Sequence, residues 1–143
     1  MITTLQKEEL QLYKPKFRNR SHARMDFGDW QKELNRKIKQ QMPANLCFSV
    51  SVRDHFLDRL IDREADPRHI KKLIEDTIQK KMCEILFFGA LHTSIPRMVF
   101  TDSIHHVMTT WSDHNRTIIV RSYFLNADRL VGLNPEFTLN PHI

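Results

Sequence analysis

Glycine and cysteine are scarce in this sequence, and long apolar runs are missing. It has only three glycines and two cysteines in 143 residues. Cys47 and Cys83 lack the spacing of a redox or metal motif, so we expect two free thiols and no disulfide. No apolar run approaches the roughly 20 residues of a membrane span, and the opening MITTLQKEEL carries acids where a secretion signal needs bases. We therefore expect a cytoplasmic protein without a membrane partner.

The length favours one domain, because 143 residues enclose a single modest core. Within it we distinguish a basic, helical part over residues 1–43 from a core over residues 44–143, and we expect a monomer. The net charge of +5 and the sequence pI near 9.4 favour a polyanionic partner, since basic side chains displace the counterions of a phosphate backbone.

Basic side chains fall at every second residue near the start of the chain, with no acid among them. In an extended chain this alternation places all of them on one side, where they could follow a phosphate backbone while Tyr13 and Phe17 stack on bases. The alternative is a solvated basic linker between two helices. The residues of this basic arm are Lys14, Lys16, Arg18, Arg20, His22 and Arg24.

Apolar periodicity and capping residues predict helices in the first part of the chain. Pro43 ends one of them, Ser51 is a candidate N-cap for the next, and Asp66 followed by Pro67 is a cap with proline at the first helical position. A short strand is predicted over residues 46–50. The predicted helices cover residues 3–12, 29–42 with a possible start at Asp26, 52–64 and 67–82.

Branched and aromatic residues dominate after Cys83, which favours strands. Ser112 to Asn115 form the predicted turn between the last two of them. Helices followed by a meander of strands indicate an α+β domain in which N-terminal helices pack on a C-terminal antiparallel sheet. The predicted strands cover residues 84–91, 97–101, 104–111 and 116–124.

The predicted helix from Val52 carries His55, Arg59 and Arg63 one turn apart beside its apolar face. We call these three residues the polar ladder. Histidine transfers protons near neutral pH and arginine binds phosphate oxygens in pairs, so the ladder combines the groups that metal-free cleavage of a phosphodiester needs. The alternative is a solvated face with ion pairs inside the helix.

The predicted hairpin offers a second cluster. With Trp111 opposite Arg116, His106 faces Arg121, and Tyr123 lies on the same, open face of the sheet. A slip by one residue would exchange His106 for His105. Alternatively, the two histidines form a strand pair packed at the rim of the sheet.

Metal ligation is not expected. His105 and His106 are adjacent on a strand and point to opposite faces, so they cannot both bind one ion. The other histidines are scattered without the spacing of a zinc site. We expect no metal and no other cofactor.

The stretch FSVSVRDHFLDRLIDREAD, residues 48–66, resembles the RegB endoribonucleases of T-even phages. A looser likeness extends to Ile118, Ile119 and residues 129–132, and the spacing of the polar ladder also occurs among RelE-like toxins. The positions that carry the resemblance are Phe48, His55, Leu57, Asp58, Arg59, Ile61, Arg63, Glu64 and Asp66.

The resemblance implies a small α+β ribonuclease fold of the RelE and barnase kind, with RNA bound against the exposed face of a sheet. It implies metal-free cleavage of messenger RNA by the 2′-hydroxyl, a 2′,3′-cyclic phosphate product and help from a ribosomal protein. His55 falls on the family's first catalytic histidine, whereas Glu75 occupies the position of the second. Glu75 could serve as a general base if its pKa were raised, or the role has moved to His69 or His106.

Our leading hypothesis is an endoribonuclease in which His55 works with Glu75 or His106. Arg59, Arg63 and Arg121 would bind the phosphate, and the basic arm and Tyr123 would bind the RNA. One alternative is a non-enzymatic protein that binds RNA or a host factor. Another is a RelE-type toxin that cuts messenger RNA on the ribosome.

Overall fold

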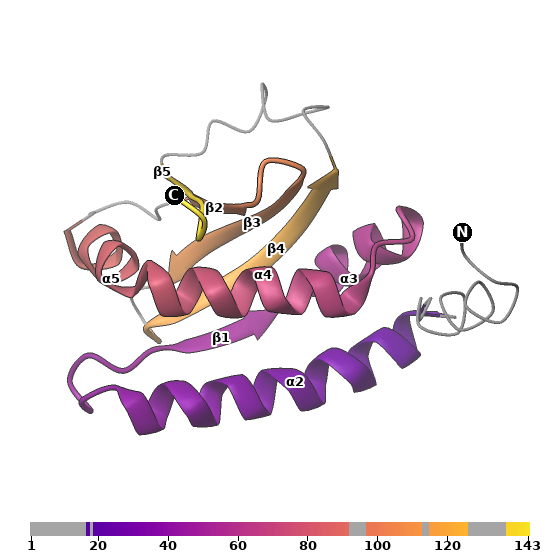
Figure 1. Ribbon diagram of the computed structural model, residues 1–143. Helices are drawn as coiled ribbons and strands as arrows, with labels where there is room; N and C mark the ends of the chain where they lie inside the picture. Colours follow the sequence, from indigo (N-terminus) through magenta and orange to yellow (C-terminus); the bar gives the residue numbers. More distant parts are fainter. Residues whose placement is uncertain (1–16, 18, 92–96, 113–114, 126–136) are drawn as a thin grey trace, which may run out of the picture.

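The computed structural model describes residue 17 and residues 19–91, 97–112, 115–125 and 137–143 (Figure 1). The predicted helix over residues 3–12 lies outside the described residues, as do Lys14, Lys16 and Arg18. None of the described helices is long and apolar enough to cross a membrane. In chain order the elements are α2 (Arg20–Gln41), β1 (Ser49–Val52), α3 (Asp54–Asp62), α4 (Pro67–Lys80), α5 (Met82–Leu91), β2 (Arg97–Thr101), β3 (His105–Ser112), β4 (Thr117–Leu125) and β5 (Phe137–Leu139).

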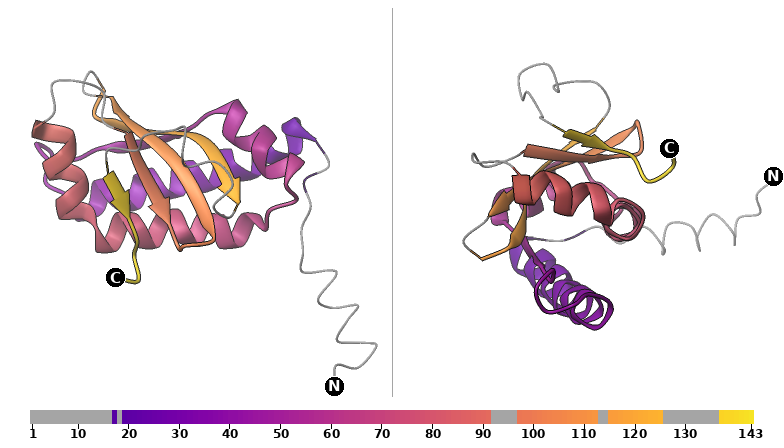
Figure 2. Two further views of the ribbon diagram at one scale, coloured as in Figure 1. Left: turned by 90° about the horizontal axis from the view of Figure 1, so that it is seen from above. Right: turned by 90° about the vertical axis from the view of Figure 1, so that its left-hand side faces the viewer.

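The strands form one mixed sheet in the order β1-β4-β3-β2-β5. The predicted α+β class is confirmed, and the expected antiparallel pairing holds for β2, β3 and β4. At the two edges, β1 pairs with β4 and β5 with β2 in parallel. The short strand β5 was not predicted. The described helices gather on one side of the strands (Figure 2).

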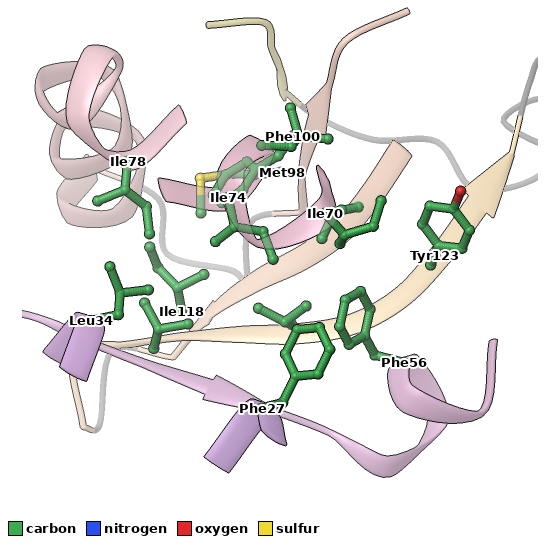
Figure 3. Packing of buried hydrophobic residues seen from close by; sticks show 14 of the residues in the cluster. Phe27, Leu34, Phe56, Ile70, Ile74, Ile78, Met98, Phe100, Ile118 and Tyr123 are labelled. Carbon is green, nitrogen blue, oxygen red and sulfur yellow. The ribbon is translucent and has the colours of Figure 1, made fainter. Parts of the chain in front are cut away.

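The hydrophobic core fills the space between the helices and the sheet (Figure 3). Its helical side includes Phe27 and Phe56, whose rings meet edge to face at 5.7 Å between centroids, and Ile74 of α4. Its sheet side includes Ile118 and Trp111, which are 0% and 2% exposed. Burial of apolar side chains of this size is the main stabilising term of a small domain.

Helix α2 begins earlier than predicted, because Asn19 accepts a hydrogen bond from the backbone N–H of His22 and caps it. The extended conformation expected for the basic arm is therefore wrong for its last part. Arg20 and Arg24 stand one helical turn apart and bind Asp58 and Asp54 of α3. These bidentate pairs hold α2 against α3.

Strand β1 is an edge strand whose outer backbone groups are satisfied by amide side chains of α2. Asn35 bonds both the N–H and the carbonyl of Val50, and Gln31 accepts from the N–H of Val52. The strand lies later than predicted because these amides fix its position. Ser51 belongs to the strand, so its predicted role as a helix cap is wrong, and Arg53 takes the N-cap position of α3.

The N-terminus of α4 follows the prediction. Asp66 accepts a hydrogen bond of 3.1 Å from the N–H of Arg68, and Pro67 occupies the first turn. The predicted strand over residues 84–91 is wrong, because this segment belongs to α5. Its run contains one β-branched residue, Ile85, and no turn residue separates it from α4. Its aromatic content alone favoured a strand.

Gly89 tests the close approach of α5 to the sheet. A Cβ atom at Gly89 would lie 2.7 Å from the ring of Trp111, whereas one at Gly28 in α2 meets nothing within 4 Å. We predict that Gly89→Ala lowers the free energy of unfolding by about 1–3 kcal/mol through overpacking. The matched Gly28→Ala should raise it by about 0.5–1 kcal/mol, since alanine favours a helix. Chemical denaturation measures both, and equal effects would contradict the packing described.

Candidate active site

The register of the β3–β4 hairpin determines which side chains can meet. Trp111 lies opposite Ile118, so the predicted pairing with Arg116 is wrong by two residues. Further along, Met108 pairs with Ser122 but Thr109 with Val120, which leaves Arg121 as the extra residue of a β-bulge. In a regular strand, successive side chains point to opposite faces of the sheet. The extra residue therefore reverses this alternation for the residues that follow it. Tyr123 consequently lies on the helix side of the sheet instead of the predicted open face.

Four polar side chains meet where α4 begins and the β2–β3 turn closes. His69 Nε2 lies 2.7 Å from Asp102 Oδ2, and His105 Nδ1 lies 2.6 Å from the hydroxyl of Tyr123. The rings of His69 and His105 are 4.5 Å apart between centroids. We call His69, Asp102, His105 and Tyr123 the histidine cluster.

Asp102 is held in place by the turn that it opens. Its Oδ1 atom accepts from the backbone N–H groups of Ile104 and His105, at 2.9 and 2.6 Å. Burial disfavours the carboxylate, but these bonds and the one with His69 outweigh it, so the pKa of Asp102 is lowered. A fixed, ionised carboxylate can orient His69 and stabilise its ring when that ring carries a positive charge.

Burial sets the protonation of the other two members. It lowers the pKa of His105, although Asp102 opposes the shift, so this imidazole favours its neutral form. It also raises the pKa of Tyr123 to about 12, helped by the charge of Asp102 and opposed by that of Arg63. The cluster thus combines a neutral imidazole held by a phenol with a second imidazole held by a carboxylate.

His55 and Arg59 of the polar ladder lie on α3, and Arg63 follows as its C-cap, close enough to the cluster to act on Tyr123. Arg59 Nε lies 3.4 Å from His55 Nε2, and the guanidinium of Arg63 lies 6.0 Å from the ring centroid of Phe124, next to Tyr123. Asp54 and Asp58 face α2 instead, where hydrogen bonds from Arg24 and Arg20 lower the pKa of both. Among the described residues no carboxylate pairs with Arg59 or Arg63. These two cations remain available for phosphate.

The other predicted site residues are not brought to the ladder. Glu75 accepts a hydrogen bond of 2.6 Å from the indole of Trp30 between α2 and α4. His106 bonds Thr101 at 2.8 Å and is 6% exposed, so its predicted open position is wrong. In the sheet it pairs with Thr101 of β2 and Phe124 of β4. Arg121 is exposed and donates to Thr110 at 2.7 Å.

Sequence reasoning missed the cluster because its members are far apart in the chain. His69 was considered only as a substitute for the second family histidine, and His105 only through a register slip. Asp102 was not considered, although an aspartate three residues before His105 is typical of a turn in which the carboxylate accepts backbone N–H groups.

The family model for the T4-phage endoribonuclease RegB matches residues 14–105, more than half of the chain. The chain belongs to this family. It is therefore an endoribonuclease in the general sense of that family. The match spans His55, His69 and Asp102 and ends at His105. No curated protein and no solved structure matched the chain.

The phenol of Tyr123 tests the environment of the cluster. The chain has two tyrosines, so Tyr13→Phe leaves Tyr123 as the only phenol. We predict that it remains protonated at pH 10, where an ordinary tyrosine is half ionised, because its pKa is raised to about 12. The folded state holds this proton more tightly, so the contribution to stability is complete below pH 10 and is lost as the pH approaches 12. Ultraviolet titration measures this, and ionisation near pH 10 in the folded protein would contradict the described burial.

Proposed function

We propose that this chain cleaves RNA without a metal, by attack of the 2′-hydroxyl on the adjacent phosphate, and leaves a 2′,3′-cyclic phosphate. The observation that carries the proposal is the juxtaposition of His69 and His105, 4.5 Å apart between centroids, with separate partners that hold each ring. Two positioned imidazoles can supply the acid and the base that this reaction requires.

His105 is suited to be the general base, because burial favours its neutral form. It takes the proton of the 2′-hydroxyl as the bond from O2′ to phosphorus forms. The bond from phosphorus to O5′ breaks, and His69 gives its proton to that leaving oxygen. Asp102, at 2.7 Å, stabilises the protonated ring of His69 before the transfer. Exchange with solvent then restores both protonation states.

The ladder supplies the positive charge that the transition state needs. Arg63 lies nearest to the cluster, and a guanidinium at the scissile phosphate stabilises the charge that develops on its oxygens. Arg59 and His55 lie further back along α3, which ends at Asp62 just before Arg63. In this proposal they hold the RNA backbone next to the cleaved bond, with His55 free to share in proton transfer as the family resemblance implies.

Glu75 is not required in this scheme, because its carboxylate is engaged with Trp30. His69, already considered from sequence as a replacement, takes over the missing histidine role. We further propose that the substrate is messenger RNA in the cytoplasm and that a ribosomal protein assists the protein, which acts as a monomer. The family resemblance and the basic composition support RNA as the partner.

Cleavage by histidine variants tests the proposal. We predict that wild type cuts a mixed messenger RNA pool in EDTA and leaves cyclic phosphate ends. His69→Gln and His105→Gln should each lower the rate by about 10²–10⁴-fold, the usual contribution of a general acid or base. His142→Gln, an exposed histidine near the end of the chain, is the matched control and should cut normally.

Three other results would favour a different catalytic site or a different function. Loss of cleavage in His55→Ala with full activity in His69→Gln and His105→Gln would place the chemistry on the ladder. Cleavage only in the presence of ribosomes would favour the toxin hypothesis. RNA binding without cleavage under any condition would favour a binding protein.

Glu75→Gln separates a structural from a catalytic role for that residue. Glutamine keeps a carbonyl oxygen for the indole N–H of Trp30 but cannot accept a proton as a base. We predict that the cleavage rate of Glu75→Gln stays within about twofold of wild type, a loss well below the 10²–10⁴-fold expected for a general base. A loss of that size without a change in stability would make Glu75 the partner of His55.

A further inference from the structure

We propose that His69, Asp102 and His105 form a binding site for a divalent transition-metal ion such as Zn²⁺, and that the bound ion switches off RNA cleavage. One candidate ligand atom from each of the three side chains lies within 4.8 Å of the other two. The inference of inhibition rests on the proposed function, whereas the metal site itself does not.

Two histidines and one aspartate are a common set of ligands for transition-metal ions. Two imidazoles and one carboxylate bind Zn²⁺ or Fe²⁺ with coordination positions left open, while Mg²⁺ and Ca²⁺ prefer oxygen ligands alone. Bond lengths near 2.0–2.2 Å place the ligand atoms of a tetrahedral zinc site about 3.3 Å apart. His69 and Asp102 need to separate slightly from 2.7 Å, and His105 needs to approach, which small side-chain rotations can provide.

Groups outside the three ligands already orient them. Tyr123 bonds Nδ1 of His105, which leaves Nε2 of that ring for a metal. The other carboxylate oxygen of Asp102, Oδ1, accepts hydrogen bonds from two backbone N–H groups. Metal-binding histidines and carboxylates are usually held by such hydrogen bonds, which reduce the cost of ordering the site.

The solvent exposure of the ligands also suits an ion that can bind and leave. His69 is exposed, with its side chain 49% accessible, while Asp102 is 12% accessible. An ion can therefore enter from solvent and still be partly enclosed. Once bound, it occupies Nε2 of His105, the nitrogen left to accept a proton, and takes the carboxylate of Asp102 away from the protonated ring of His69. Cleavage and metal binding thus compete for the same two imidazoles.

The test measures binding and cleavage separately on the full chain. Calorimetry with Zn²⁺ alone, and visible absorption with Co²⁺ as a spectroscopic substitute, should show one ion bound per chain. Asp102→Asn and His69→Gln should abolish that binding, and His142→Gln should not alter it. Tyr123→Phe should weaken it by about tenfold while leaving all three ligands, as expected for a partner that orients a ligand.

RNA cleavage by wild type should stop when one equivalent of Zn²⁺ is added and return with EDTA. Absence of binding, or binding that survives both Asp102→Asn and His69→Gln, would overturn the metal site. Normal cleavage by the zinc-loaded protein would overturn the inhibition. Cleavage that requires Zn²⁺ would overturn the metal-free mechanism proposed above while leaving the metal site standing, so the two failures are distinguishable.

Discussion

A single extra residue in β4 determines what can gather at the candidate active site. The register of β3 and β4 skips Arg121, and from that point the faces of β4 are exchanged relative to a regular strand. Without the bulge, Tyr123 would lie on the far side of the sheet from His69. With it, the phenol reaches His105 on the helix side at 2.6 Å. Bulges commonly redirect a side chain in this way near functional sites.

The local sequence at the start of α4 fixes where His69 meets the sheet. The cap at Asp66 and Pro67 starts α4, and His69 follows in its first turn, exposed toward the β2–β3 turn. Asp102 opens that turn and binds His69 across it. The cluster is therefore assembled from a helix start, a tight turn and a bulged strand, each of which holds its residue through backbone hydrogen bonds.

Much of the fold could be predicted from the sequence because its signals are local. The cap of α4, the strands β2, β3 and β4 and the spacing of the polar ladder depend on neighbouring residues alone. The failures involve contacts between distant segments. Aromatic content favoured a strand where α5 packs Gly89 against Trp111, and alternation of bases favoured an extended arm where Arg20 and Arg24 bind acids of α3.

The candidate site was predicted only in part for the same reason. The ladder is visible in sequence, but whether Glu75, His69 or His106 completes it depends on the bulge and on the partners of each side chain. Glu75 has an indole partner and His106 is enclosed, whereas His69 and His105 stand together beside Asp102.

The central claim is that RNA is processed at the histidine cluster. Nuclear magnetic resonance of the imidazole nitrogens, during titration with an oligonucleotide that lacks the attacking 2′-hydroxyl, tests it most directly. We predict that the signals of His69 and His105 shift together at saturation while that of the buried His106 stays in place. Shifts confined to His106, or to His55 with none at His69 and His105, would contradict it.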